Sequence, residues 1–412
     1  MSRVSDPSFP HWATWLDSME GVPEWPQPVE SPVERVGRGT LMSRGHDVFG
    51  WLGTILPGLG LALAVAAAGR WGAHRLGTAV LGFAQSPVSE ISVAIVLGLV
   101  IRNTVGLPAV YERGLRLCGR EVLRAGIVLL GLRLSLGAVG RIGLVGIPVI
   151  LGCIATALVA VTWLNRVLGL PRRLGSLIAV GTSICGVSAI VATAPVIDAE
   201  EDEVSYAVAC VTLFGLLALF AYPFLAHVLF GDDPRLAGLF LGTAIHDTAQ
   251  VAGAGLMYQQ QFHAPRALST AMVTKLVRNL SMVGVIPLVG VLYHGRAGGQ
   301  ATRARFRIAQ AVPVFVLGFL AAAAVRTTGD LGDRPFFLLG RSSWNGLLAQ
   351  ADALAAWCLV AAMASVGLGT SLGRVMRLGW KSFFVGLVAA AAVGGVGAVL
   401  IGLLGRYLEQ VS

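Results

Sequence analysis

The sequence predicts an all-α, polytopic membrane protein with about eleven transmembrane helices, because two features of its composition leave little water-facing surface. The 412-residue chain is 55% hydrophobic and only 13% charged, whereas a soluble domain carries about 25% charged residues. The runs 48–69, 142–164 and 383–405 contain no Asp, Glu, Lys, Arg or His. Each run is long enough to cross a hydrocarbon core of about 30 Å as a helix.

The predicted spans follow one another along the chain, and two of them, 88–104 and 309–326, are short. In chain order they cover 48–69, 88–104, 118–137, 142–164, 173–197, 204–230, 236–258, 267–292, 309–326, 351–376 and 382–405. The segment 327–350 has room for a further interfacial helix. Residues 1–45 lack the apolar core of a signal peptide. They are predicted to form a cytosolic tail in front of a transmembrane domain over 46–412.

Basic residues gather in alternate loops, which indicates the orientation. With the N-terminus inside, the cytoplasmic loops carry Arg113, Arg116, Arg166, Arg172, Arg173, Arg296, Arg303, Arg305, Arg307, Arg374, Arg377 and Lys381. An opposite loop, "DAEEDE" at 198–203, has no basic residue. The positive-inside rule therefore favours a cytoplasmic N-terminus and an external C-terminus. The same rule explains the net charge of +9. Because no basic stretch is interleaved with aromatic residues, no nucleic-acid partner is expected.

Two short sequence echoes suggest internal repetition. The pattern G-L-x-x-S-L-G occurs at 131–137 and at 367–373. The two predicted helices that carry it run in opposite directions, which is typical of inverted-repeat transporters with discontinuous helices, although a chance match in a Gly/Leu-rich chain is the alternative. The second echo compares "GTSICGVSAIVATA" (181–194) with "GTAIHDTAQVAGAG" (242–255). These two segments are predicted to run in the same direction and are therefore not paired as an inverted repeat.

The span 173–197 concentrates glycines and hydroxyl residues in its middle. They are Gly181, Thr182, Ser183 and Gly186. Such residues weaken a helix, and an interruption would present free backbone N–H groups in the membrane, where a helix N-terminus attracts anions. The alternative is close helix packing through small residues.

The span 236–258 carries ionisable and amide side chains inside an apolar segment. His246, Asp247 and Gln250 are predicted to share one helix face. An ionised Asp in lipid costs several kcal/mol, about 2.5–3.5 on the insertion scale, so it should have a partner in a polar interior. Either these residues lie on a substrate or ion pathway, or Asp247 clamps a neighbouring helix through a salt bridge.

The span 267–292 places two cations and an amide on one face, namely Lys275, Arg278 and Asn279. With Asp247 as the nearest carboxylate, the site would keep a net positive charge, which suits an anionic substrate. The alternative is that one or both cations extend to the membrane surface. Arg102, Arg133 and Arg141 are interpreted as interface anchors, and Asp352 as a charge at a helix N-terminus.

The cysteines and the polar residues indicate no resident metal or cofactor. The five cysteines form no C-x-x-C pair and sit mostly in apolar segments. Ser183, His246 and Asp247 include the residue types of a hydrolytic triad. No G-x-S-x-G or H-E-x-x-H motif accompanies them, so an enzyme is not expected and an intramembrane hydrolase is kept as an alternative.

Four segments together resemble signature segments of a known family. They are "GIVLLGLRLSLG" (126–137), "GTSICGVSAIVATAPVI" (181–197), "LGTAIHDTAQVAGAG" (241–255) and "TKLVRNL" (274–280). They are similar to the bacterial sulfate exporter family, whose name rests on an inferred activity, within the superfamily of cation/proton antiporters and bile-acid symporters. The resemblance implies a bacterial inner-membrane location, inverted repeats, discontinuous helices that cross at mid-membrane, and alternating access.

The combined interpretation is a secondary transporter, in the exporter direction, of a small anion such as sulfate or a sulfonate. Predicted substrate ligands are Gly181, Thr182, Ser183, Gly186, Lys275, Arg278 and Asn279. The predicted coupling residues for H⁺ or Na⁺ are His246, Asp247 and Gln250, with His246 chosen because its pKa ordinarily lies near neutrality. An anion channel is the second alternative, and a homodimer is a candidate assembly.

Overall fold

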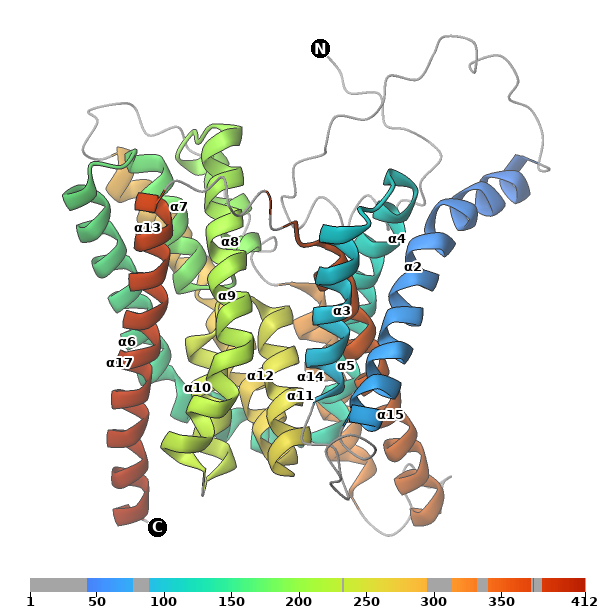
Figure 1. Ribbon diagram of the computed structural model, residues 1–412. Coiled ribbons are helices and arrows are strands. Elements are labelled where there is room, and N and C mark those ends of the chain that lie inside the picture. The colour runs from blue at the N-terminus through green and yellow to red at the C-terminus, as the bar shows by residue number, and fades with distance from the viewer. Residues whose placement is uncertain are drawn as a thin grey trace, which may run out of the picture.

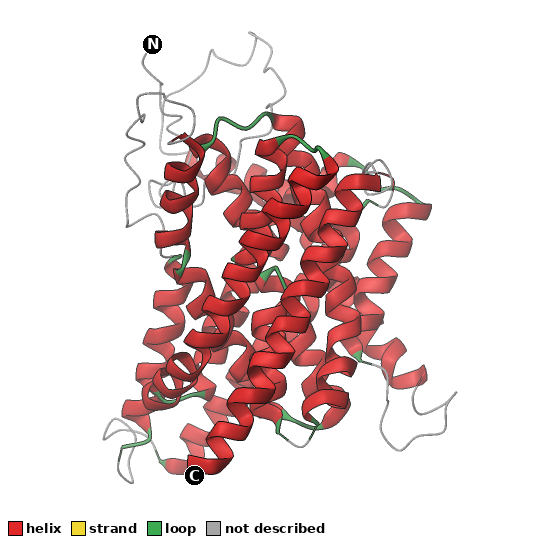
Figure 2. Ribbon diagram, turned by 90° about the vertical axis from the view of Figure 1, so that its left-hand side faces the viewer, coloured by secondary structure: helices red, strands yellow, loops and turns green. Residues whose placement is uncertain are grey.

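The computed structural model describes residues 43–76, 89–231, 233–294, 313–331, 340–371, 373 and 380–411. In these residues every regular element is a helix and no strand occurs (Figure 2). Residues 1–42 of the predicted tail, the basic positions between 296 and 307, and Arg374 and Arg377 lie outside the described residues.

Within the described ranges, six helices are long and apolar enough to cross a membrane, which supports the predicted class of a helical membrane protein. They are Leu52–Arg75, Leu136–Leu168, Glu201–Phe230, Pro265–Tyr293, Arg341–Gly369 and Trp380–Gly405. Two shorter apolar helices, Val187–Val196 and Val314–Gly329, accompany them. Residues 341–350 of the predicted interfacial segment belong to the long helix α15 (Arg341–Gly369).

The helices form two groups, which lie on the right and the left of Figure 1. The scaffold group comprises α2 (Ser43–Arg75), α3 (Glu90–Thr104), the α4–η4–α5–η5 segment from Glu112 to Arg133, α14 (Val314–Gly329) and α15 (Arg341–Gly369). The hairpin group comprises α6 (Leu136–Leu168), α7 (Arg172–Ser183), α8 (Val187–Thr193), α9 (Glu201–Phe230), α10 (Pro234–Ala244), α11 (Thr248–Phe262), α12 (Pro265–Leu280), α13 (Met282–His294) and α17 (Trp380–Val411). The main contacts between the groups are those of α11 with α3 and α15, and of α6 with α14.

Local sequence signals fix several helix starts. Ser135 caps α6 by accepting a hydrogen bond from the Ala138 N–H. Asp233 caps α10, with Pro234 in the first turn. Glu200 and Glu203 form a reciprocal capping box at the start of α9. These side chains satisfy N–H groups that have no partner inside the helix.

The segment predicted as one span at 173–197 is a hairpin of two short helices, α7 and α8. A Cβ atom on Gly181 of α7 would lie 2.8 Å from Ile190 of α8. In a continuous helix these positions would be separated by about 13 Å, so α8 must turn back along α7. The turn is made at Ile184–Gly186, where Gly186 has a φ of 73°, a backbone conformation that favours glycine.

The segment predicted as one span at 236–258 is a second hairpin, α10 and α11. Gly238 and Gly242 of α10 contact α12 in increasing register, at Ala267 and then at Ala271, so the two helices run parallel. Thr248 at the start of α11 lies beside Asn279 near the end of α12, and Gly255, further along α11, lies beside Leu268, early in α12, so α11 runs antiparallel to α12. Hence α11 turns back along α10.

The two hairpins enter the helix bundle from opposite ends. The first begins where α6 ends, and the second begins where α9, the long helix between them, ends (Figure 1). The prediction that 181–194 and 242–255 run in the same direction is therefore wrong. The expectation that 198–203 faces away from the basic loops is also wrong, because Arg173 Nη1 lies 3.3 Å from Glu200 Oε1.

The first echo keeps its predicted geometry. Gly119 contacts Ser365, and Gly126, seven residues later, contacts Cys358, so the α4–α5 segment and α15 run antiparallel. The opposite directions of the two G-L-x-x-S-L-G helices are thus confirmed, while descent from a repeat stays a prediction.

Candidate functional site

The tips of the two hairpins meet inside the helix bundle. The first tip is Ile184–Gly186 and the second is Ile245–Asp247. A Cβ atom on Gly186 would lie 3.1 Å from Asp247 Oδ2. Helix α12 passes both tips and contributes Lys275 and Arg278, which are both 0% exposed. The alternative that these cations reach the membrane surface is therefore wrong.

Lys275 bridges the two tips through main-chain carbonyl groups. Its ammonium donates to the carbonyl oxygens of Ile184 at 2.8 Å and Ile245 at 3.0 Å. It also donates to the carbonyl oxygen of His246. An ammonium has three donors, so all of them are engaged with the backbone.

Arg278 bridges the same tips one turn further along α12. Its Nε donates to the Ser183 carbonyl oxygen at 2.8 Å. Its two terminal nitrogens donate to the carbonyl oxygens of Thr182 and Thr243. In the echo of the two hairpins, Thr182 corresponds to Thr243 and Ile184 to Ile245, so each cation contacts equivalent carbonyls on both sides.

These contacts supply hydrogen-bond donors to the C-terminal ends of α7 and α10, which are buried away from solvent. The last carbonyls of α7 and α10 have no partner inside their helices, and the C-terminus of a helix attracts positive charge. The sequence predicted Lys275 and Arg278 as substrate ligands. In this structure their donors bind the ends of α7 and α10, and a direct contact with substrate stays a prediction.

Asp247 caps α11 and forms no close ion pair within the described part of the chain. Its Oδ1 accepts a hydrogen bond from the Ala249 N–H at 2.8 Å, as expected at a helix N-terminus. Among the described residues no Lys, Arg or His nitrogen lies within 4.0 Å of its carboxylate. The alternative of a salt-bridge clamp is therefore not found. Asp247 and Thr248 are partly exposed, whereas their neighbours in 241–246 are buried.

His246 and Gln250 do not share one helix face with Asp247, because the helix is interrupted at this point. His246 lies in the turn before α11, is 1% exposed, and neither ring nitrogen has a hydrogen-bond partner among the described residues. Gln250 packs instead on the long helix α9, where its Nε2 donates to the Thr212 carbonyl oxygen at 3.2 Å. Gly215 provides the space for that side chain.

The remaining predicted residues have packing or backbone roles. A side chain at Gly181 would collide with Ile190. The Ser183 hydroxyl donates to the Val180 carbonyl oxygen at 3.0 Å. Asn279 donates to the Thr248 hydroxyl at 3.2 Å, and its buried Oδ1 has no partner. Contact of these residues with a ligand stays a prediction.

The residue types of a hydrolytic triad are not arranged as one. The Ser183 hydroxyl is bound to the backbone and both His246 nitrogens are without a partner, so the Ser–His hydrogen bond of a triad is not formed. In the described part of the chain no three His, Cys, Asp or Glu side chains gather as a metal site, and the five cysteines are free.

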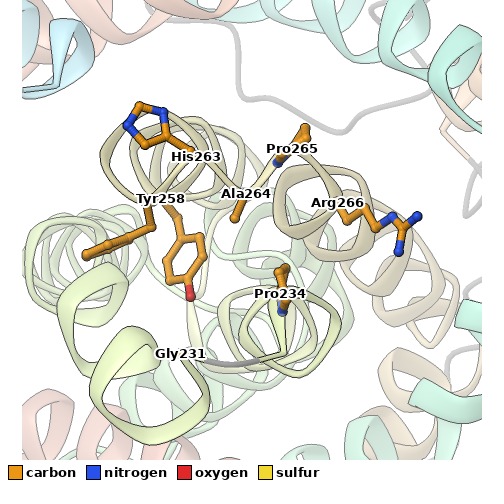
Figure 3. Close-up of a pocket in the computed structure, with 8 residues that line it drawn as sticks. Gly231, Pro234, Tyr258, His263, Ala264, Pro265 and Arg266 are labelled. Carbon is orange, nitrogen blue, oxygen red and sulfur yellow. The ribbon is translucent and has the colours of Figure 1, made fainter. Parts of the chain in front are cut away.

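A surface pocket lies away from the tips, at the base of the second hairpin. It has a volume of about 210 Å³ and is lined by Gly231, Pro234, Tyr258, Phe262, His263, Ala264, Pro265 and Arg266. In Figure 3 the His263 and Arg266 side chains point away from the Tyr258 ring and Pro234. The pocket contains none of the predicted site residues.

Sequence reasoning missed the carbonyl acceptors at Ile184 and Ile245. A main-chain carbonyl is present in every residue, so residue type gives no signal for it. The echo between the two segments was the available signal, because it aligns both acceptors.

The fold and the site define a helical membrane protein with two opposed re-entrant hairpins around a buried cationic pair. Within this class, the chain belongs to the family described as conserved hypothetical protein 698, whose model matches residues 57–386. A UPF0324 membrane protein of Nitratidesulfovibrio vulgaris is 34% identical over 347 residues, covering 81% of this chain and 89% of that protein. A UPF0324 membrane protein of Bacillus anthracis is 30% identical, covering 84% and 94%. No solved structure gives a significant match.

Proposed function

We propose that the protein is a secondary transporter of a small anion, such as sulfate or a sulfonate, that works by alternating access. The observation that carries the proposal is the buried junction of two opposed hairpins at Lys275 and Arg278. Interrupted helices at membrane depth survive where they are buried in protein or line a cavity, and transporters use them to bind solutes.

The charge balance of the junction favours an anion. Two cations, Lys275 and Arg278, and one carboxylate, Asp247, leave one net positive charge when all are ionised. The negative partial charges of the two helix C-termini at the junction and the positive partial charges of the two helix N-termini largely cancel, so the helix dipoles add little net charge. A monoanion, or a dianion accompanied by a cation, would balance the junction.

Asp247 is the proposed coupling residue for H⁺ or Na⁺. It is the carboxylate at the junction, lies on the partly exposed side, and has no cation within 4.0 Å among the described residues. His246, adjacent and without a partner, is its proposed companion. The export direction, the bacterial inner membrane and a cytoplasmic N-terminus belong to the same proposal. The cytoplasmic N-terminus is supported by basic loop residues of the sequence such as Arg113, Arg172 and Lys381.

Alternating access is proposed as a movement of the hairpin group against the scaffold group. The main contacts between them are restricted to α11 and the start of α6. Inside each group the helices pack extensively, so each group can move as a body.

The test begins with a ligand screen on the purified protein with sulfate, sulfite, thiosulfate, taurine and small carboxylates, read as thermal stabilisation. Ligands that stabilise the protein are then measured as flux into proteoliposomes against pH and sodium gradients. Saturable flux that responds to one gradient supports the proposal. Absence of both stabilisation and flux for every anion would refute it, and non-saturable flux independent of both gradients would indicate a channel.

A further inference from the structure

Two consecutive glutamines on α11 connect the second hairpin to the scaffold group. Arg133 Nη1 donates to Gln259 Oε1 at 2.7 Å, and the Ser89 hydroxyl donates to Gln260 Oε1 at 2.9 Å. Arg133 is in turn paired with Asp352 of α15. These contacts correct the interpretation of Arg133 as an interface anchor and of Asp352 as a charge at a helix start, because Asp352 lies inside α15.

Both contacts lie at one end of the molecule. Gln259 and Gln260 belong to the last turn of α11, Ser89 caps the start of α3, and Arg133 ends the α5–η5 segment. Nearer the tip, α11 meets the scaffold group through Gly253, which faces Met363 of α15. The surface that α11 presents to the scaffold group therefore includes a position without a side chain near the tip and hydrogen-bonding side chains at the outer end.

We infer that Gln259 and Gln260 form a latch that holds the second hairpin on the scaffold group at this end of the molecule and opens when the hairpin group moves. The inference rests on the proposed alternating access. The latch is distinct from the tips, since none of its residues contacts Lys275, Arg278 or Asp247 in the described structure. Hydrogen bonds between mobile bodies can break at modest cost, unlike buried apolar packing.

Hydrogen exchange of the purified full chain, followed by mass spectrometry over residues 255–262, tests the latch without requiring transport. The double variant Gln259→Ala with Gln260→Ala should exchange at least about tenfold faster there, as expected for loss of a charge-assisted and a neutral hydrogen bond. The matched control is Gln261→Ala, because Gln261 makes no side-chain hydrogen bond in the described structure and should exchange like the wild type. Equal exchange in all three proteins would overturn the inference.

Gln259→Glu gives a second test, in which hydrogen exchange is expected to slow instead of accelerate. The substitution keeps the size of the side chain. A carboxylate facing Arg133 should strengthen the contact, so exchange over 255–262 should slow several-fold. Unchanged or faster exchange in this variant would overturn the latch. If wild-type protein shows no flux but the exchange results hold, the transport proposal fails, while the attachment of the second hairpin to the scaffold group through Gln259 and Gln260 is supported.

Discussion

Gly186 and Asp247 stand opposite each other at the tips of two hairpins, so close that a Cβ on Gly186 would lie 3.1 Å from Asp247 Oδ2. The two residues occupy equivalent places in the echo between the hairpins. One tip therefore supplies a carboxylate and the other supplies the space for it. Two features favour glycine at position 186. A side chain there would crowd Asp247, and the φ of 73° is a backbone conformation that other residues rarely adopt.

Gly186→Ala should destabilise the protein by at least about 1–2 kcal/mol, because an alanine at this φ is strained before any contact is counted. The measurement is the thermal unfolding midpoint in detergent. Gly284→Ala is the matched control, since a Cβ there meets no atom within 4 Å. Equal midpoints for the two variants would contradict the backbone conformation of Gly186 at the hairpin tip.

Lys275→Met should cost about 3 kcal/mol or more, because three buried carbonyl groups lose their donor and each unsatisfied group costs about 1–3 kcal/mol. The same thermal assay measures it. Arg235→Ala is the control: it removes an exposed ion pair with Asp233, worth less than about 1 kcal/mol. If the Met variant were as stable as the control, Lys275 would not hold the hairpin tips together.

Asp247→Asn should preserve the fold and change the ion coupling. Asn caps a helix about as well as Asp, so the hydrogen bond from the Ala249 N–H can be kept. Flux in proteoliposomes should then lose its dependence on the pH or sodium gradient, while the unfolding midpoint stays near that of the wild type. Flux that keeps the wild-type gradient dependence would remove Asp247 from the coupling mechanism.

Asp330, in the turn after α14, should contribute stability that depends on pH. Burial raises the pKa of Asp330, but hydrogen bonds from Arg326 and Trp344 together with the charge of Arg326 outweigh it and hold the pKa below its ordinary value. A depressed folded-state pKa stabilises the fold above the unfolded pKa, and this stability is lost as pH falls through the folded pKa. Asp330→Asn should therefore be less stable than wild type at pH 7, and the difference should shrink below about pH 4. A constant difference across this range would contradict the assignment.

The sequence by itself determined that the chain is a helical membrane protein and that polar residues interrupt its apolar segments at 173–197, 236–258 and 267–292. Charge and hydropathy are properties of residue type, so cations such as Lys275 in an apolar run are visible without a structure. The sequence did not determine that the first two segments turn back. An apolar segment has the same composition whether it crosses the membrane or forms a hairpin. Only the tertiary structure decided the direction of α8 and α11, through contacts such as Gly181 with Ile190. It also decided the partners of Lys275 and Arg278, because these are main-chain carbonyls, which acquire a distinct role only where a helix ends beside a buried cation.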